Sequence, residues 1–239
     1  LECLGIANKL NPFLRFVENY ASTHRVPPMP SFRCSGRLRN ISYNVKLSFI
    51  RLLTPAMTTI TIVKKGREVA IAADSQSTFG DTRLRATYDA RSNKIFQLGE
   101  SFIGISGSAA HDLVFQAALP KLKKRDFSSR AAIFDTFRRL HSKLKDDYFL
   151  KTDEDEDDPY ESSQMTLLIA NPSGIFAVYS MREVYEYNRF WAIGSGRDYA
   201  LGAMSAVYDS TATAAEIAQL GVSTGCEFDI NSSAPHTLY

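Results

Sequence analysis

Three residues near the middle of the chain are of the types that activate a hydroxyl nucleophile. Thr58 directly follows Met57. If Met57 is the true start and is removed, the Thr58 hydroxyl lies beside its own free α-amino group, which titrates near neutrality and can act as general base. Asp74 and Lys94 are candidates for a charge pair that lowers the proton affinity of that hydroxyl. Either charged residue alone more often forms a structural ion pair, but the three together indicate a hydrolase.

Two Gly-Ser turns stand where a predicted strand meets a predicted helix. In Ser106-Gly107-Ser108, the Gly107 N–H would lie at the positive end of a helix dipole, which is oxyanion-hole geometry. A glycine that merely makes a tight turn is an equally good interpretation. Gly194-Ser195-Gly196 can cap a helix, bind an anion or bring the Ser195 hydroxyl to a reacting centre. Neither turn has the spacing or the Lys of a phosphate-binding P-loop.

The hydrophobic pattern predicts strands followed by helices, twice over. A hairpin over 58–63 and 68–74, a polar loop over 75–92 and strands over 94–98 and 101–107 precede helices from 109 and over 128–150. Strands over 165–170, 174–179 and 187–193, predicted as a second sheet, precede helices over 199–208 and from 213, with a weakly patterned tail from 227. This order predicts an α+β fold in which two stacked sheets lie between helical layers.

Two segments fit none of these elements. Residues 153–158 are consecutive carboxylates before Pro159, which predicts a solvated loop rather than a metal site. Residues 1–57 are rich in Arg and Pro and lack a sustained period, so we expect an N-terminal extension that is separate from a domain over 58–239. Translated upstream sequence is favoured, because residue 1 is Leu and not Met, over a targeting segment or a propeptide.

The composition excludes several other classes of protein. The 239 residues are 44% hydrophobic and 23% charged, which is ordinary for a globular protein. Three distant cysteines predict neither a zinc site nor a disulfide framework, and no apolar run has the length of a membrane span. After residue 57, 20 basic residues face 24 acidic ones, which argues against nucleic-acid binding. We therefore expect a soluble, cytoplasmic protein.

Five motifs together resemble the proteasome β-type N-terminal nucleophile hydrolases, most closely the HslV-like bacterial peptidases and related bacterial proteasome homologues. The resemblance covers Thr58 to about Asp229 and implies a four-layer αββα sandwich. The motifs are Thr58-Thr59-Ile60, Ala72-Ala73-Asp74-Ser75-Gln76-Ser77-Thr78, Asn93-Lys94-Ile95, Gly104-Ile105-Ser106-Gly107-Ser108-Ala109-Ala110 and Ala192-Ile193-Gly194-Ser195-Gly196.

The resemblance implies a role for each matching residue. Thr58 would be nucleophile and α-amino base, Asp74 and Lys94 the charge pair that tunes it, Gly107 the oxyanion amide, and Ser195 a hydroxyl that supports the amine. The implied substrate-binding residues are Ser77, Thr78, Ile105 and Ala109, with Ile105 making an apolar pocket.

The sequence departs from the family at one functional position. Where many relatives have an Asp that pairs with the Ser of Gly-Ser-Gly, it has Gly225, with Glu227 and Asp229 nearby. The loop between Asp74 and Lys94 is also longer than in HslV. No cofactor is implied, and a sodium ion held by main-chain carbonyls would leave no mark on the sequence.

The resemblance predicts a threonine-type endopeptidase that degrades unfolded proteins or peptides. It implies stacked rings of this subunit and a partner AAA+ unfoldase ATPase, without nucleic acid or membrane. Two alternatives stay open. One is a catalytically inactive ring subunit, because 57 residues precede Thr58 and no Gly stands directly before it. The other is an amidohydrolase that acts on a small amide.

Overall fold

The computed structural model describes residues 57–152 and 158–239. The predicted extension, apart from Met57, and most of the acidic run lie outside the described residues.

The first sheet is built on the predicted hairpin. Strands β1 (Thr59–Lys65) and β2 (Glu68–Ala73) pair antiparallel around Gly66, whose φ of 62° suits a residue without a Cβ. Strand β10 (Phe190–Gly194) adds to the free edge of β1, and the short β11 (Thr237–Leu238) adds to β2. The first five residues of β1 are buried, as expected of a central strand rich in β-branched residues.

The second sheet is a five-stranded antiparallel meander. Its strands follow the chain order β5 (Ile95–Leu98), β6 (Ser101–Ser106), β7 (Thr166–Asn171), β8 (Gly174–Val178) and β9 (Val184–Tyr187). The predicted division of the strands between sheets was therefore wrong. β5 and β6 join the later strands, and the single strand predicted over 187–193 is two strands that enter different sheets, because β10 leaves to complete the hydrogen bonding of β1.

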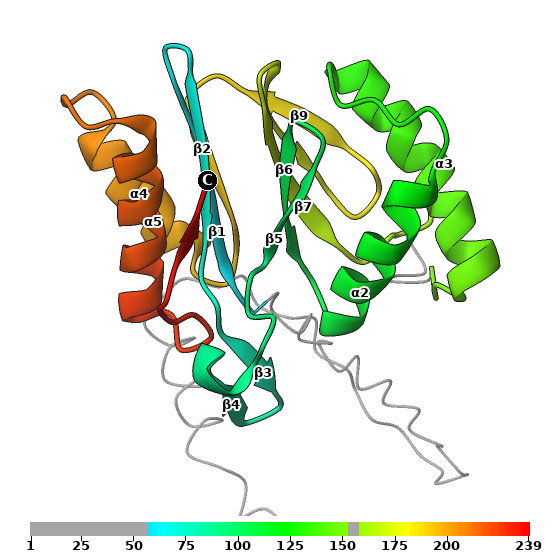
Figure 1. Ribbon diagram of the computed structural model, residues 1–239, viewed down its shortest axis with the longest axis horizontal. Helices are drawn as coiled ribbons and strands as arrows, with labels where there is room; N and C mark the ends of the chain where they lie inside the picture. Colours follow the sequence, from blue (N-terminus) through cyan, green and yellow to red (C-terminus); the bar gives the residue numbers. More distant parts are fainter. Residues whose placement is uncertain (1–56, 153–157) are drawn as a thin grey trace, which may run out of the picture. The chain divides into compact units, whose positions relative to one another are not determined.

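The helices cover the outer faces of the two sheets (Figure 1). The pair α2 (Ala109–Ala118) and α3 (Arg130–Tyr148) packs on the second sheet through one buried apolar cluster. The pair α4 (Arg197–Val207) and α5 (Ala214–Phe228) packs on the first sheet through another. A third cluster fills the space between the sheets. The predicted αββα sandwich is confirmed.

The short elements depart from the predictions. The predicted polar loop over 75–92 contains a two-stranded ribbon, β3 (Ser77–Phe79) and β4 (Thr82–Leu84), and a 3₁₀ turn over Ala86–Tyr88. A second 3₁₀ turn, Leu119–Lys121, ends α2. Among the residues that the structure describes, no helix is long and apolar enough to cross a membrane, and no group of three metal-ligating side chains gathers.

Candidate active site

Thr58, Asp74 and Lys94 form one hydrogen-bonded group between the sheets. The Lys94 Nζ donates to Thr58 Oγ1 at 2.8 Å and to Asp74 Oδ1 at 2.7 Å. The Thr58 hydroxyl donates to the same Asp74 oxygen at 2.6 Å. Thr58 and Asp74 are buried, whereas the Lys94 side chain keeps 16% of its surface exposed. The hydroxyl thus lies between a cation and an acceptor, as activation of a weak nucleophile requires.

The fold places this group through the hairpin and the start of the second sheet. Pairing of Ile60 with Ala73 sets the beginning of β1 beside the end of β2, so Thr58 and Asp74 meet. Lys94 directly precedes β5 and its carbonyl accepts from Ile105 N at 3.4 Å. One charged partner therefore comes from each sheet.

Backbone N–H groups fix the Asp74 carboxylate. Its Oδ1 accepts from Thr59 N at 3.0 Å, and its Oδ2 accepts from Gln76 N at 2.9 Å and Ser233 N at 3.3 Å. These donors compensate the burial of a carboxylate, which would otherwise be strongly unfavourable. The charge that faces the Thr58 hydroxyl is consequently held in one orientation.

Burial lowers the pKa of the Lys94 ammonium below its ordinary value, and the charge and hydrogen bond of Asp74 partly oppose that shift. A buried ammonium holds its proton less tightly than one in water. It therefore stabilises negative charge on an adjacent oxygen strongly while it is protonated, because little water screens it.

Ser195 and Asp229 form a second network at the Thr58 backbone. Thr58 N donates to Ser195 Oγ at 3.3 Å, and Ser195 Oγ donates to Asp229 Oδ2 at 2.6 Å. Ser232 Oγ donates to the same carboxylate oxygen at 2.6 Å. Gly225 therefore does not leave Ser195 without a carboxylate partner, because the nearby Asp229 accepts from Ser195.

Gly225 lies on the face of α5 that meets β1. A Cβ at this position would lie 2.6 Å from both Thr59 Oγ1 and Thr59 Cγ2, so no side chain fits there. Asp229 is the C-cap residue, one turn later. Two carboxylates near Gly225, Glu227 and Asp229, were candidates for the partner of Ser195. The rotation of α5 relative to Thr59 brings Asp229, and not Glu227, to that position.

Replacing Asp229 with Asn tests this second network. An amide keeps one uncharged acceptor oxygen, and its NH₂ must face either the two serine hydroxyls or the donating Asn231 N–H, so Ser195 is held less firmly toward Thr58 N. We expect kcat for peptide cleavage to fall about tenfold and the unfolding free energy to fall by about 1 kcal/mol. Ser195→Ala should cost a similar factor, and the double variant no more than the larger of the two, since both changes break one chain of contacts. Fully additive losses would contradict a shared network.

The other predicted site residues differ in how deeply they are buried. Gly107 is exposed between the end of β6 and Ser108, the N-cap of α2, and Ala109 is the exposed first residue of α2. Ile105 is 6% exposed and packs in the cluster between the second sheet and its helices. Ser77 and Thr78 are half-buried in β3. Their contacts with a substrate stay predictions.

Cys226 is a neighbouring residue that the sequence did not single out. Burial, and next the charge of Asp74, raise the pKa of its thiol to about 12. Because the thiolate is the nucleophilic form of cysteine, this thiol is unreactive at neutral pH. Thr58 therefore has no competing sulfur nucleophile from this side chain.

Comparison with known proteins identifies the family of this chain. The family described as proteasome subunit matches residues 56–224. The chain belongs to the proteasome subunit family. Its HslV-like type is also clear from curated relatives named ATP-dependent protease subunit HslV. The protein from Caldicellulosiruptor saccharolyticus is 30% identical over 64% of this chain and 80% of its own length, and that from Rickettsia typhi is 30% identical over 67% and 82%.

Solved structures agree with this assignment. Thiobacillus denitrificans BPH in complex with epoxomicin is 40% identical, with a TM-score of 0.72 over 76% of this chain and 97% of its own. Eukaryotic HslV from Trypanosoma brucei, 21% identical with a TM-score of 0.56, shares the fold. The proteasome family consists of threonine peptidases, so the predicted enzyme class is confirmed at the level of the family.

Proposed function

We propose that residues 58–239 form the mature subunit and that Thr58, as its first residue, is the nucleophile of a threonine endopeptidase. The observation that carries this proposal is the contact of Thr58 Oγ1 with both Lys94 Nζ and Asp74 Oδ1. Two matches support the boundary. The family match begins two residues before Thr58. The Thiobacillus structure covers 76% of this chain, which is also the share that residues 58–239 make up.

The mechanism requires that the bond between Met57 and Thr58 be broken, because an amide nitrogen is no base. The freed α-amine can act as a base only in its uncharged form, which is present near neutral pH. In that form it takes the Oγ1 proton as Oγ1 attacks the peptide carbonyl. The amine then returns that proton to the leaving nitrogen, and the acyl group stays on Oγ1 as an ester. A water molecule deprotonated by the same amine hydrolyses the ester and restores the hydroxyl.

The neighbouring residues have separate roles in this mechanism. Lys94 stabilises charge on Oγ1 during attack, and Asp74 fixes Lys94. Ser195 accepts from the Thr58 nitrogen and keeps the amine directed at the hydroxyl. We assign the carbonyl oxyanion to the Gly107 N–H, because Gly107 directly follows the end of β6 and Ile105, two residues earlier, donates its N–H to the Lys94 carbonyl.

Substrate and assembly follow from the family. We propose that an unfolded peptide binds along Ser77, Thr78 and Ala109, with Ile105 at the base of an apolar pocket. Because the curated relatives are subunits of an ATP-dependent protease, we propose that copies of this chain stack in rings and receive unfolded protein from an AAA+ ATPase in the cytoplasm.

The N-terminus of the protein made from its own gene tests the proposal. We expect intact mass and N-terminal sequencing to show Thr58 as the first residue, and expect that form to cleave unstructured fluorogenic peptides and to bind epoxomicin. The matched control is the same chain with Met57 retained, in which the amine is blocked. If the native protein keeps residues before Thr58 and neither cleaves peptides nor binds epoxomicin, it is an inactive ring subunit and the proposal is wrong.

A further inference from the structure

His111 lies directly behind the turn that carries the proposed oxyanion amide. It is the third residue of α2, and its Nδ1 accepts from Ser108 N at 3.3 Å. In return, the His111 N–H donates to Ser108 Oγ at 3.4 Å. This reciprocal pair is a capping box, in which Glu or Gln is the usual third residue. Here a titratable imidazole has that place.

The imidazole also rests against Gly107 itself. A Cβ built on Gly107 would lie 3.1 Å from His111 Nδ1, so the ring fills the space where a side chain would be. Glycine has little intrinsic preference for one backbone orientation. The hydrogen bond from Ser108 N to the ring helps to fix the peptide plane that follows Gly107. The ring also packs beside the Gly107 Cα, so the two contacts together restrain the φ and ψ of Gly107 and, through φ, the preceding peptide plane that carries the Gly107 N–H.

The cap depends on the protonation state of the ring. Nδ1 can accept from Ser108 N only in the neutral imidazole that carries its proton on Nε2. Protonation converts Nδ1 to a donor and places a positive charge at the positive end of the α2 dipole, where a cation is unfavourable. The Nδ1–H can then donate to Ser108 Oγ, 3.2 Å away, but the Ser108 N–H loses its acceptor and the turn loses that restraint.

We infer that His111 is a positioning residue for the Gly107 oxyanion amide and that it acts only in its neutral form. This inference rests on the proposed function. His111 touches no substrate and acts through the Gly107-Ser108 turn. Protonation of the ring removes this role as pH falls.

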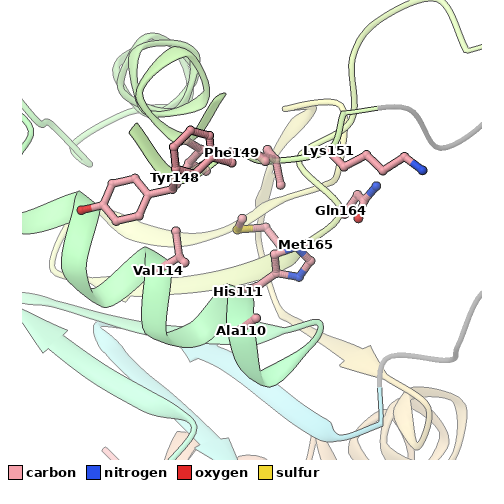
Figure 2. A pocket seen from close by; sticks show the side chains of 10 residues that line it. Ala110, His111, Val114, Tyr148, Phe149, Lys151, Gln164 and Met165 are labelled. Atoms are coloured by element: carbon pink, nitrogen blue, oxygen red, sulfur yellow. The ribbon is translucent and has the colours of Figure 1, made fainter. Parts of the chain in front are cut away.

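The ring lines a pocket of about 200 Å³ between α2 and the end of α3. Figure 2 shows His111 beside Met165 and Gln164 at one end of this pocket. The other charged or titratable described groups there are Tyr148 and Lys151, and Asp112 follows His111 on its own helix, bonded to Gln116. The cationic Lys151 favours the neutral ring.

Two substitutions in the chain that begins at Thr58 separate positioning from general stability. His111→Gln keeps an acceptor that cannot titrate, whereas His111→Ala removes it. At pH 8 we expect kcat of the Ala variant to fall roughly tenfold with little change in KM, less than the 100-fold or more that follows loss of an oxyanion donor. We expect His111→Gln to keep kcat within about twofold of the unmodified protein.

The acid limb of kcat/KM gives the decisive readout. Protonation of the Thr58 amine lowers kcat/KM of every variant as pH falls below about 7.7. As pH falls along this limb, the unmodified protein should lose up to about tenfold more activity than His111→Gln, because only its cap can be protonated.

Glu216→Ala is the matched control, because it removes the other capping box, at the start of α5. We expect it to lower Tm about as much as His111→Ala while kcat stays unchanged. If His111→Ala keeps normal kcat, or if the acid limbs of His111→Gln and the unmodified protein coincide, the inference is wrong while the proposed function stands. If the unmodified chain cleaves no peptide, the proposed function itself has failed.

Discussion

We expect the replacement of Thr58 with Ala to abolish peptide cleavage in the chain that begins at this residue, a loss of about 10⁴-fold or more. The change removes the atom that forms the acyl ester in the proposed mechanism, and the nearby Cys226 thiol, whose pKa is raised to about 12, does not replace it. The structural cost is small. Lys94 and Asp74 still pair directly at 2.7 Å, so we expect to lose only about 1 kcal/mol of unfolding free energy for the hydroxyl.

Steady-state cleavage and thermal melting, measured on the same preparations, check this expectation. Thr58→Ser is the matched control, because it keeps the hydroxyl and removes only a methyl group. We expect it to keep activity within about tenfold and to accumulate the acyl ester, which intact mass detects. Cleavage by Thr58→Ala at the rate of the unmodified chain would show that the peptidase centre lies elsewhere.

Replacing Lys94 with Met costs both activity and stability. The uncharged side chain cannot stabilise developing charge on Thr58 Oγ1, so we expect kcat to fall by about 10³-fold. It also leaves the fully buried Asp74 carboxylate without its counter-ion. Loss of one partner of a buried pair typically costs 3–5 kcal/mol. We expect about 3 kcal/mol, since three backbone N–H groups still bind the carboxylate.

A double variant separates these two effects. Adding Asp74→Asn to Lys94→Met removes the uncompensated charge, so we expect unfolding free energy to recover in part while kcat stays low. Lys65→Met serves as the remote control, because that Lys also makes two hydrogen bonds, to Ser210 O and Ala212 O, away from the site. A Lys94→Met variant that is destabilised but fully active would remove Lys94 from the mechanism.

Local patterns predicted most of the elements and the centre of the site. The hairpin around Gly66 has alternating β-branched strands and a turn residue, and its closure is what brings Asp74 to Thr58. The helix that begins after Ser108 was also predicted, since a Ser N-cap before apolar positions at helical spacing is a local signal. These features depend on residues near each other in the chain.

Long-range pairing could not be predicted in the same way. Strand β10 has the same apolar pattern as β8, yet it pairs with β1, more than a hundred residues earlier. The two-residue β11 and the three-residue β3 and β4 are too short for periodicity to indicate. Asp229 depends on the rotation of α5 about Gly225, and no residue near Asp229 in the sequence specifies that rotation.

The tail after α5 completes the site, and this has a consequence for biosynthesis. Ser233 N binds Asp74, Asp229 binds Ser195, and β11 pairs with the edge of β2, so residues after α5 contact partners synthesised much earlier. Synthesis proceeds from the N-terminus, and early segments fold first. A growing chain on the ribosome thus has Thr58, Asp74 and Lys94 long before it has the groups that orient them. Under the proposed function, we therefore expect proteolytic competence to arise only after translation has passed α5, because the contacts of Ser233 and Asp229 are made last.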